Sequence, residues 1–341
     1  MSSVDPIAAL RRIAFLLERQ QEATYRVKAY RKAANALAAL EADEVRRLAA
    51  SGSLTRLADV GPKTAAVATE ALDGDVPSYL AALEAASPDR LAAGGESLRA
   101  ALRGDLHTHS DWSDGGSPPQ EMAEAYVAVG HEYAALTDHS PRLTVARGLS
   151  SERLREQLTV VAELNEQLAP FRLLTGIEVD ILDDGSLDQR DDLLAELDVV
   201  VASCHSNLAM ERAAMTRRMV AAVRNPLVDV LGHCTGRLVT GGRGTRKQSQ
   251  FDAGQVLAAC AEAGTAVEIN SRPERADPPD ELLDLAVDAG CLFSIDSDAH
   301  APGQLDFLDF GTARAVARRV PKERIVNAWA LDDLLAWTGS P

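Results

Sequence analysis

From residue 103 onward, the chain alternates between short apolar runs and longer stretches in which apolar residues recur with helical spacing. The apolar runs cover residues 104–108, 133–138, 173–181, 199–205, 228–233, 266–270 and 292–297. A chain that alternates strands with helices folds into a sheet of parallel strands covered by those helices. Seven such units fit a closed barrel better than an open sheet, so the pattern predicts an α/β barrel.

The N-terminal part of the chain has a different pattern, in which each segment has the apolar spacing of a helix. Asp5 followed by Pro6 is a typical helix start, and Gly61 followed by Pro62 predicts a tight hairpin between two short helices. A stretch with proline, a glycine pair and mixed charge follows. We therefore predict three parts: an all-helical domain over residues 1–86, a linker over 87–102 and the barrel over 103–341.

The formal net charge of −16 argues against a nucleic-acid-binding surface on the chain as a whole. The charge is unevenly distributed, because residues 1–100 hold 13 basic and 13 acidic side chains and all the excess acid follows them. Residues 1–63 alone carry a net charge of +4. Any contact with DNA is therefore expected from the N-terminal domain.

Features that direct a chain to a membrane or out of the cell are missing from the sequence. No apolar run is long enough to cross a bilayer, and the N-terminal residues lack the pattern of a signal peptide. The four cysteines form no CxxC pair and are expected to be reduced thiols. These features predict a cytoplasmic protein without membrane contact and assign no oligomeric state.

Histidines and carboxylates gather at the C-terminal ends of the predicted strands. Nine such residues have this position: His107, His109, Asp114, His139, Glu178, His205, His233, Asp298 and His300. The C-terminal strand ends of a parallel barrel open onto one face, and a cluster of this kind without metal would be costly to desolvate. The set therefore predicts two or three Zn, Mn or Fe ions, with Glu178 available as a bridge. His131 lies outside the pattern, and Cys204 and Cys234 are expected to be buried bystanders.

The segments HTHSDWSDG, TDHS, GIEVDI, SCHS, GHCTGR, EINS and SDAH, in this order, resemble the PHP (polymerase and histidinol phosphatase) domain family. The resemblance implies a distorted seven-stranded (β/α)7 barrel and metal-dependent hydrolysis of phosphoesters. It also implies three divalent ions (Zn, Mn or Fe). His107, His109, Glu178 and Asp298 would hold the first ion, Glu178, His205 and His233 the second, and Asp114, His139 and His300 the third. No further catalytic residue is implied.

Arginines after the fifth and sixth predicted strands are candidate contacts for the substrate phosphate or leaving group. Four of them are the predicted substrate-binding residues: Arg237, Arg243, Arg246 and Arg275. Arg272 and Lys247 are further candidates because they lie in the same two stretches. For each of these residues, a solvated loop without contact to substrate is an equal alternative.

The N-terminal segments YRVKAYRKAANALAAL and LADVGPKTAAVATEAL resemble the helical domain of family X DNA polymerases, with its helix-hairpin-helix. The resemblance implies that a DNA phosphate binds the hairpin through Gly61, Lys63 and Thr64. Arg31, Lys32 and Lys28 would add positive charge. Two positions depart from the family pattern: Asp59 replaces the usual first glycine, and Val67 stands where lyase-competent relatives carry a lysine. A helical scaffold without DNA contact is the alternative.

Three functions are compatible with this sequence. The first is a metal-dependent phosphoesterase acting on DNA ends or nucleotides, as a 3'-5' exonuclease or a phosphatase. The second is a small-molecule phosphomonoesterase of the histidinol-phosphatase kind, and the third is a non-catalytic module that binds DNA or a partner. The complete ligand set argues against the third, and the stretch over 87–102 is too short for a polymerase palm, so polymerisation is not expected.

Overall fold

The computed structural model describes residues 4–241 and 244–339 of the chain, which divides into two compact units, residues 1–90 and 91–341. Residues 91–102, which fall in the predicted linker, lie in the second unit. Within this stretch Glu96–Arg99 form the short helix α6, and Leu98 and Leu102 are buried in the core of the second unit.

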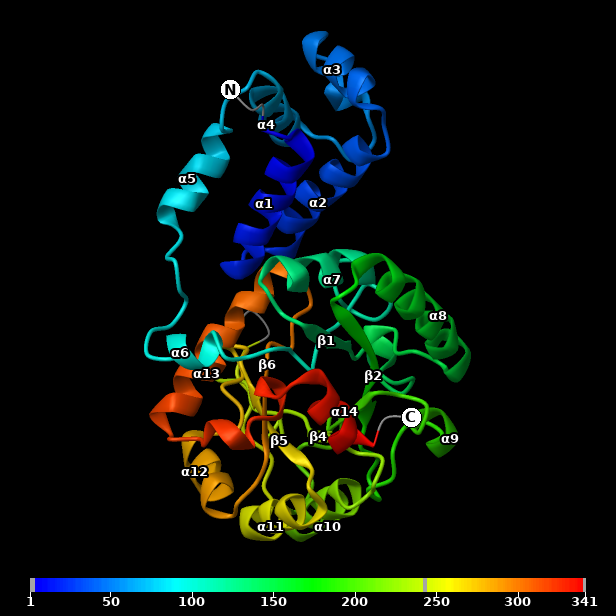
Figure 1. Cartoon of the computed structure of the whole chain (residues 1–341), viewed down its shortest axis with the longest axis vertical. Coiled ribbons are helices and arrows are strands. Elements are labelled where there is room, and N and C mark those ends of the chain that lie inside the picture. The colour runs from blue at the N-terminus through cyan, green and yellow to red at the C-terminus, as the bar shows by residue number, and fades with distance from the viewer. Residues whose placement is uncertain (1–3, 242–243, 340–341) are drawn as a thin grey trace. The chain divides into compact units, whose positions relative to one another are not determined.

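The first unit is all-helical, as the apolar spacing predicts (Figure 1). Its helices are α1 (Pro6–Arg19), α2 (Thr24–Ala38), α3 (Ala42–Ala50), α4 (Pro62–Leu72) and α5 (Ser78–Ala86), with a 3-10 turn at Leu54–Arg56. The Asp5 carboxylate caps α1 by accepting hydrogen bonds from the amides of Ile7 and Ala8. Leu10 and Leu17 of α1 and Leu37 of α2 are fully buried in one core. This apolar core holds the hairpin at the start of α4 in place.

The second unit is built on a six-stranded parallel sheet in the sequential order β1 to β6. The strands are β1 (Tyr133–Leu136), β2 (Arg172–Asp180), β3 (Val199–Ser203), β4 (Val230–Leu231), β5 (Ala266–Asn270) and β6 (Phe293–Asp296). Residues of β3 and β5 are buried along their whole length, as expected of parallel strands that are covered on both faces.

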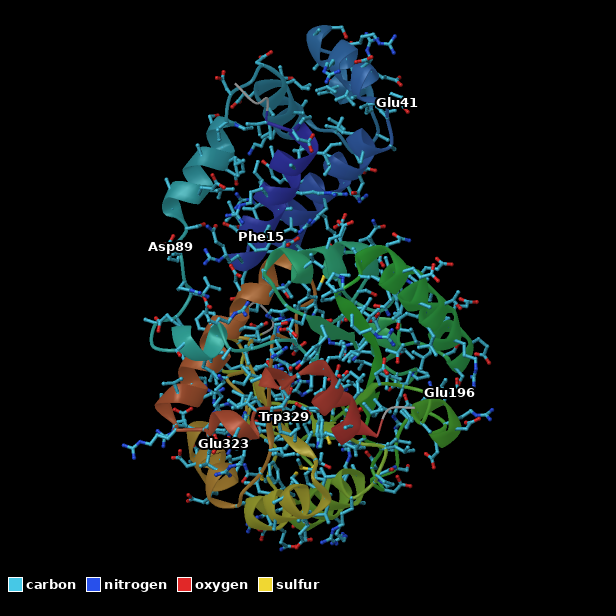
Figure 2. The ribbon with its side chains drawn as sticks, in the orientation of Figure 1. Phe15, Glu41, Asp89, Glu196, Glu323 and Trp329 are labelled. Carbon is cyan, nitrogen blue, oxygen red and sulfur yellow. The ribbon has the colours of Figure 1, made fainter. Side chains whose placement is uncertain are left out.

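Helices alternate with these strands along the chain and pack around the sheet (Figure 1). They are α7 (Pro119–Ala128), α8 (Ser151–Leu168), α9 (Asp191–Leu194), α10 (Arg212–Val223), α11 (Ala253–Ala263), α12 (Asp280–Asp288), α13 (Leu308–Ala317) and α14 (Leu331–Thr338). Short 3-10 helices cover Thr144–Ala146, Pro302–Phe307, Lys322–Arg324 and Val326–Ala328. Side chains fill the interior, and Glu196 lies at the outside (Figure 2).

The described residues form six strands where the sequence predicts seven, because residues 104–108 are not a regular strand. This segment still pairs with both neighbours: the Ala135 amide donates to the Asp105 carbonyl at 2.8 Å, and the His109 amide donates to the Ala299 carbonyl at 2.8 Å. The ladder is interrupted because buried carboxylates bind backbone amides. Asp296 Oδ1 accepts from the Leu106 amide at 2.8 Å, and Asp105 Oδ1 accepts from the Ser297 amide at 3.2 Å.

The parallel order brings the C-terminal ends of all six strands to one edge of the sheet. Six of the predicted ligands lie at or just beyond these ends, and His107, His109 and Asp114 lie in or after the irregular segment 104–108, which pairs with the same sheet. The topology therefore brings the nine residues close to one another. Among the described residues, no helix combines the length and the apolar character needed to span a membrane.

Candidate metal centre

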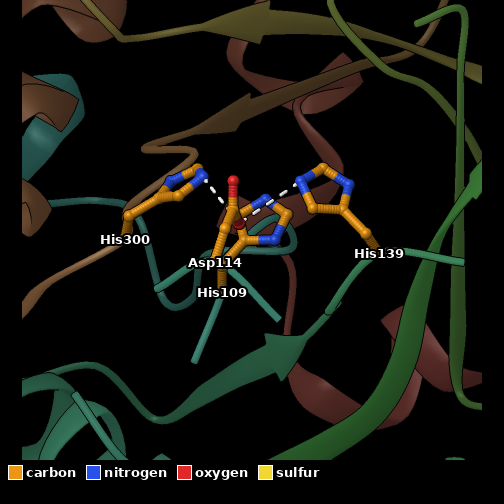
Figure 3. Close-up of side chains that lie close together, drawn as sticks. All are labelled: His109, Asp114, His139 and His300. Carbon is orange, nitrogen blue, oxygen red and sulfur yellow. Dashed lines mark ion pairs between the residues drawn. The ribbon is translucent and has the colours of Figure 1, made fainter. Parts of the chain in front are cut away.

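All nine predicted metal ligands come together at this edge of the sheet. They form four groups whose ligand atoms lie within 4.8 Å of one another: His109, Asp114, His139 and His300; His107, His109 and Asp298; His107, Glu178 and His233; and His139, Glu178 and His205. Figure 3 shows the first group, in which the Asp114 carboxylate lies between the rings of His139 and His300. Neighbouring groups share residues, so the nine side chains form one continuous cluster.

Glu178 of β2 lies at the centre of the cluster and is almost fully buried. Its carboxylate oxygens approach five imidazoles: His139 Nδ1 at 2.7 Å, His233 Nε2 at 2.8 Å, His205 Nε2 at 3.2 Å, His107 Nε2 at 3.4 Å and His109 Nε2 at 3.6 Å. Burial alone would raise the pKa of Glu178, but His205, His107 and His139 outweigh burial and hold it well below its usual range. The side chain is therefore an anion placed between several potential ligands.

The cluster has the chemistry of a site for divalent metal ions. Among the described residues, several of its buried atoms make no hydrogen bond, including Nε2 of His107, Nε2 of His109, Nε2 of His205 and Oε2 of Glu178. A buried polar atom without a partner costs about 1–3 kcal/mol, and a cation would satisfy these atoms. Burial, together with the neighbouring imidazoles of His300 and His139, lowers the pKa of His109 to about 3. His109 is therefore neutral and can offer a lone pair to a metal.

A carboxylate that the sequence analysis missed holds one of these histidines in place. Glu268 of β5 is fully buried, and its Oε1 lies 2.6 Å from Nδ1 of His107. Its Oε2 accepts hydrogen bonds from the His233 amide and from Asn270 Nδ2. A proton on His107 Nδ1 leaves Nε2 free to bind a metal, which is the usual arrangement of a carboxylate behind a metal-binding histidine. An acidic residue inside the apolar run over 266–270 was the available signal.

Glu268→Gln is expected to weaken metal binding by about 10- to 100-fold. The amide group of glutamine would place its N–H against the N–H groups of His233 and Asn270, which donate to Glu268 in the wild type. The side chain would turn to avoid this contact and would release His107. Titration of metal into the metal-stripped protein, followed by calorimetry, measures the change. Glu281→Gln, on the exposed start of α12, is the matched control. Equal affinities of the two variants for the metal would contradict this role of Glu268.

Two arginines lie against the cluster of nine candidate ligands. Arg275 Nε is 3.0 Å from Asp298 Oδ2, and Arg272 Nη1 is 2.9 Å from His300 Nδ1. Both side chains are buried. A phosphate at the cluster would therefore lie near the guanidinium group of Arg275 and that of Arg272, which also pairs with Glu274 at 2.6 Å.

The other predicted substrate contacts have different partners. Arg237 donates to the carbonyls of Arg275 and Ala276, and Arg246 Nε donates to the Gly236 carbonyl at 2.6 Å. These guanidinium groups hold the backbone of the loops, and their contact with phosphate stays a prediction. The charge and sequence position of an arginine do not show whether its side chain will bind loop carbonyls or lie beside the candidate metal ligands. Arg243 lies outside the described residues.

Residues predicted to bind DNA are divided between exposed and buried positions. Arg31 is buried and forms a two-pronged ion pair with Glu18, at 2.9 Å and 2.7 Å, so its contact with DNA stays a prediction. Lys63 is exposed at the first turn of α4, whereas Thr64 is buried and its Oγ1 accepts from the Gly61 amide at 3.0 Å. The hairpin is therefore formed, and Lys63 is its accessible cation.

Asp59 shapes the surface beside this hairpin. Its φ of 65° lies in the left-handed region that favours glycine, consistent with its place at a usual glycine position. The carboxylate lies 3.1 Å from Lys32 Nζ. Tyr25, Lys28, Lys32 and Gly61 line, with Asp59, a groove of about 560 Å³. Positive charge in the groove is thus partly neutralised by its own acidic residue.

His131 lies apart from the nine ligands, as predicted, and is buried against Arg99. Arg99 Nη1 is 3.0 Å from His131 Nε2, and the ring of Tyr126 stacks on the imidazole. Burial and the adjacent Arg99 charge lower the pKa of His131 to about 3. Cys204 is also buried, which raises the pKa of its thiol to about 12 and supports a passive role.

Acid is expected to destabilise the protein through His131. As the pH falls from about 6.5 toward 3, the unfolded chain takes up a proton that the folded protein excludes, so the free energy of unfolding decreases. At pH 5 the loss is about 2 kcal/mol. A glutamine can accept the same hydrogen bond from Arg99 without titrating. The melting temperature of His131→Gln should therefore fall less between pH 7 and pH 5 than that of the wild type. Equal decreases would contradict the assignment of the acid sensitivity to His131.

Comparison with known proteins identifies both parts of the chain. The PHP domain family matches residues 105–272, and a helix-hairpin-helix domain family matches residues 1–76. A probable phosphatase of Edwardsiella ictaluri is 30% identical over 225 residues, which cover 59% of this chain and 86% of that protein. The chain belongs to the PHP family. This PHP protein is a metal-dependent phosphoesterase.

Other relatives of this PHP protein differ in length and name. The DNA polymerase/3'-5' exonuclease PolX of Bacillus subtilis is 40% identical over 236 residues, or 69% of this chain, and the match spans only 41% of that protein. Histidinol phosphate phosphatase of Lactococcus lactis, solved with zinc, L-histidinol and phosphate, is 18% identical with a TM-score of 0.48. That match covers 64% of this chain and 94% of that structure.

Proposed function

We propose that this protein hydrolyses phosphoester bonds at DNA ends or in nucleotides, with three divalent metal ions (Zn, Mn or Fe) held by the nine clustered side chains. The observation that carries the proposal is the convergence of six imidazoles and three carboxylates with buried atoms that lack hydrogen bonds among the described residues. Bound divalent ions would polarise the phosphate and make hydroxide available near neutral pH.

The protein's own residues have separate roles in this proposal. His107, His109, Glu178 and Asp298 would hold the first ion, Glu178, His205 and His233 the second, and Asp114, His139 and His300 the third. Arg272 and Arg275 would bind the phosphate oxygens, because both guanidinium groups already lie beside metal-binding side chains. Residues 103–109 would act as the seventh, irregular strand of a barrel, supported by their hydrogen bonds to the backbone on both sides.

DNA is proposed as the substrate because of the first unit. We infer that residues 1–86 form a DNA-binding domain joined by residues 87–102 to the catalytic domain over 103–341. The match to a helix-hairpin-helix family and the exposed Lys63 at the start of α4 support this inference. A relative that matches 69% of this chain is named as a DNA polymerase and 3'-5' exonuclease. Phosphate contacts of this kind bind DNA without regard to sequence.

A small phosphomonoester is the second candidate substrate. The ion pair between Asp59 and Lys32 favours it, because the carboxylate would repel a DNA phosphate from the groove beside the hairpin. Several relatives are named as probable phosphatases. In this case the first unit would be a structural scaffold.

Lys63→Glu tests the choice between these substrates. We expect at least about tenfold weaker binding to DNA ends in low salt, because a phosphate contact is replaced by repulsion. Hydrolysis of a small phosphomonoester should not change. Lys322→Glu, an exposed site in the second unit, makes the same change in net charge and is the control. If the wild type binds no DNA even at low salt, the DNA substrate is ruled out and the small phosphomonoester remains.

A further inference from the structure

Asp114 is the most exposed of the nine candidate metal ligands. Its side chain is 34% exposed, whereas the side chains of the other eight are 0–20% exposed. It lies in a loop over residues 110–116, outside the helices and strands. Its carboxylate is nevertheless close to His139 Nε2, at 3.4 Å, and to His300 Nε2, at 3.2 Å (Figure 3). Burial does little to fix this side chain, so the contacts of the loop must hold it in place.

The buried carboxylate of Asp138 binds this loop. Asp138 follows β1, is 1% exposed and directly precedes His139. Its Oδ1 accepts from the Ser110 amide at 2.8 Å and from the Ser113 hydroxyl, and its Oδ2 accepts from the Ser110 hydroxyl at 2.6 Å. Both serines are fully buried. One carboxylate therefore fixes the start of the loop and the residue that directly precedes Asp114.

Helix α8 contributes two further contacts to the loop. Gln157 Nε2 donates to Asp138 Oδ2 at 2.6 Å, and Arg153 donates to the Trp112 carbonyl at 2.5 Å. Gln157 and Arg153 are four residues apart, which places them on one face of the helix. Arg147, from the segment before α8, donates to two more loop carbonyls. The four loop residues before the ligand are therefore all bound to other elements of the fold.

Asp138 connects two of the residues proposed to hold the third ion. His139 is its neighbour in the chain. Asp114 follows Ser113, which donates to the carboxylate of Asp138. Hydrogen-bonding groups behind the ligands of a metal fix the orientation of those ligands and raise the affinity for the ion. We propose that Asp138 is a positioning residue, which holds Asp114 at the distance from His139 that a shared metal ion requires. This inference rests on the proposed function, and the other two proposed ions have no ligand in the loop.

Ser113→Ala removes the hydrogen bond to Asp138 that lies next to Asp114 in the chain. We expect the variant to bind one ion per chain about tenfold more weakly than the wild type, because the ligand can then move with the loop. Calorimetric titration of Mn²⁺ into the metal-stripped protein measures the affinities, and elemental analysis after dialysis counts the ions that are retained. The other ions should bind as they do in the wild type.

Ser117→Ala is the matched control, since it makes the same chemical change directly after the loop. Ser117 is 1% exposed, and among the described residues its hydroxyl has no hydrogen-bond partner. Its carbonyl accepts from the Asp111 amide at 2.9 Å, and the substitution keeps this backbone contact. The control variant should therefore bind Mn²⁺ as the wild type does.

The dependence of activity on metal concentration separates a loss of positioning from a loss of fold. Hydrolysis of p-nitrophenyl phosphate by Ser113→Ala should be reduced at limiting Mn²⁺. It should return close to the wild-type rate when the Mn²⁺ concentration is raised by about the tenfold that the affinity has lost. A defect that excess Mn²⁺ leaves unchanged would contradict a role in metal positioning.

Substitutions of Asp138 test the carboxylate itself. Asp138→Ala removes the acceptor of all four hydrogen bonds and should weaken the same ion by about 100-fold. Asp138→Asn keeps an oxygen for the Ser110 amide and the Ser113 hydroxyl, and its N–H can donate to Gln157 once that amide turns. Asparagine should therefore restore most of the affinity. If asparagine is as poor as alanine, the charge of the side chain matters and its positioning role is overturned. Ser113→Ala decides the question if Asp138→Ala does not fold.

Failure of this inference differs from failure of the proposed function. Equal Mn²⁺ affinities and ion counts for Ser113→Ala and Ser117→Ala would overturn the role of Asp138, while the wild type still binds metal and hydrolyses the ester. If the metal-loaded wild type hydrolyses no phosphoester, the proposed function fails, and calorimetry still decides the positioning role. If the wild type binds neither Mn²⁺ nor Zn²⁺, both fail.

Discussion

Glu178→Gln is expected to reduce hydrolysis of a simple phosphomonoester by at least about a thousandfold, or roughly 4 kcal/mol of transition-state stabilisation. Glutamine has nearly the same shape, so the change removes the negative charge and little else. That charge lies between His139 Nδ1 at 2.7 Å and His233 Nε2 at 2.8 Å, at the point where the groups of candidate ligands meet. A neutral amide there would bind divalent ions far less well than a carboxylate.

Two measurements distinguish a loss of metal from a loss of fold in this variant. Elemental analysis should show fewer bound ions in Glu178→Gln than in the wild type, and the circular dichroism spectrum should be retained. Glu166→Gln, exposed on α8, is the control for the same chemical change. Wild-type turnover by Glu178→Gln would show that this residue does not bind a catalytic metal.

Removal of metal should have an effect of similar size. Dialysis against a chelator is expected to lower phosphomonoester hydrolysis at least about a hundredfold, because the residues that remain have no substitute for the charge and activated water that metals supply. Buried atoms such as Nε2 of His107 and Nε2 of His205 would also lose their partners. We therefore expect the melting temperature to fall together with the activity.

Re-addition of single metals completes this experiment. Zn, Mn and Fe are added one at a time to the stripped protein, and activity and melting temperature should recover together with the effective ion. His131→Gln serves as a control because His131 lies outside the four ligand groups and should respond to the chelator as the wild type does. Elemental analysis shows whether all metal has been removed. Full activity of the metal-free protein would contradict a metal-dependent reaction.

The nine candidate ligands could be predicted from the sequence because their positions follow from a local pattern. Each lies near the end of an apolar run, and parallel strands bring such ends to one edge without further information. Glu268 was missed because its partner His107 is 161 residues away in the chain. The pairing of Arg31 with Glu18 and the carbonyl contacts of Arg237 were missed for a related reason, since a sequence does not show which partner a charged side chain will find.

The seventh strand shows the same limit at the level of the backbone. Residues 104–108 have the composition of a strand, but Asp105 and Asp296 bind backbone amides that a regular ladder would pair with carbonyls. This competition between side-chain and backbone acceptors appears only when residues 104–108 lie beside the end of β6 in the folded protein.

The sequence by itself therefore determined the α/β alternation, the helical character of the first unit and the set of histidines and carboxylates that cluster, because hydrophobic period and strand-end position are local properties. Only the tertiary structure decided which arginines meet the metal cluster, which carboxylate orients His107 and which one binds the loop that carries Asp114. These features depend on contacts between distant segments, whose geometry is set when the sheet and its helices pack.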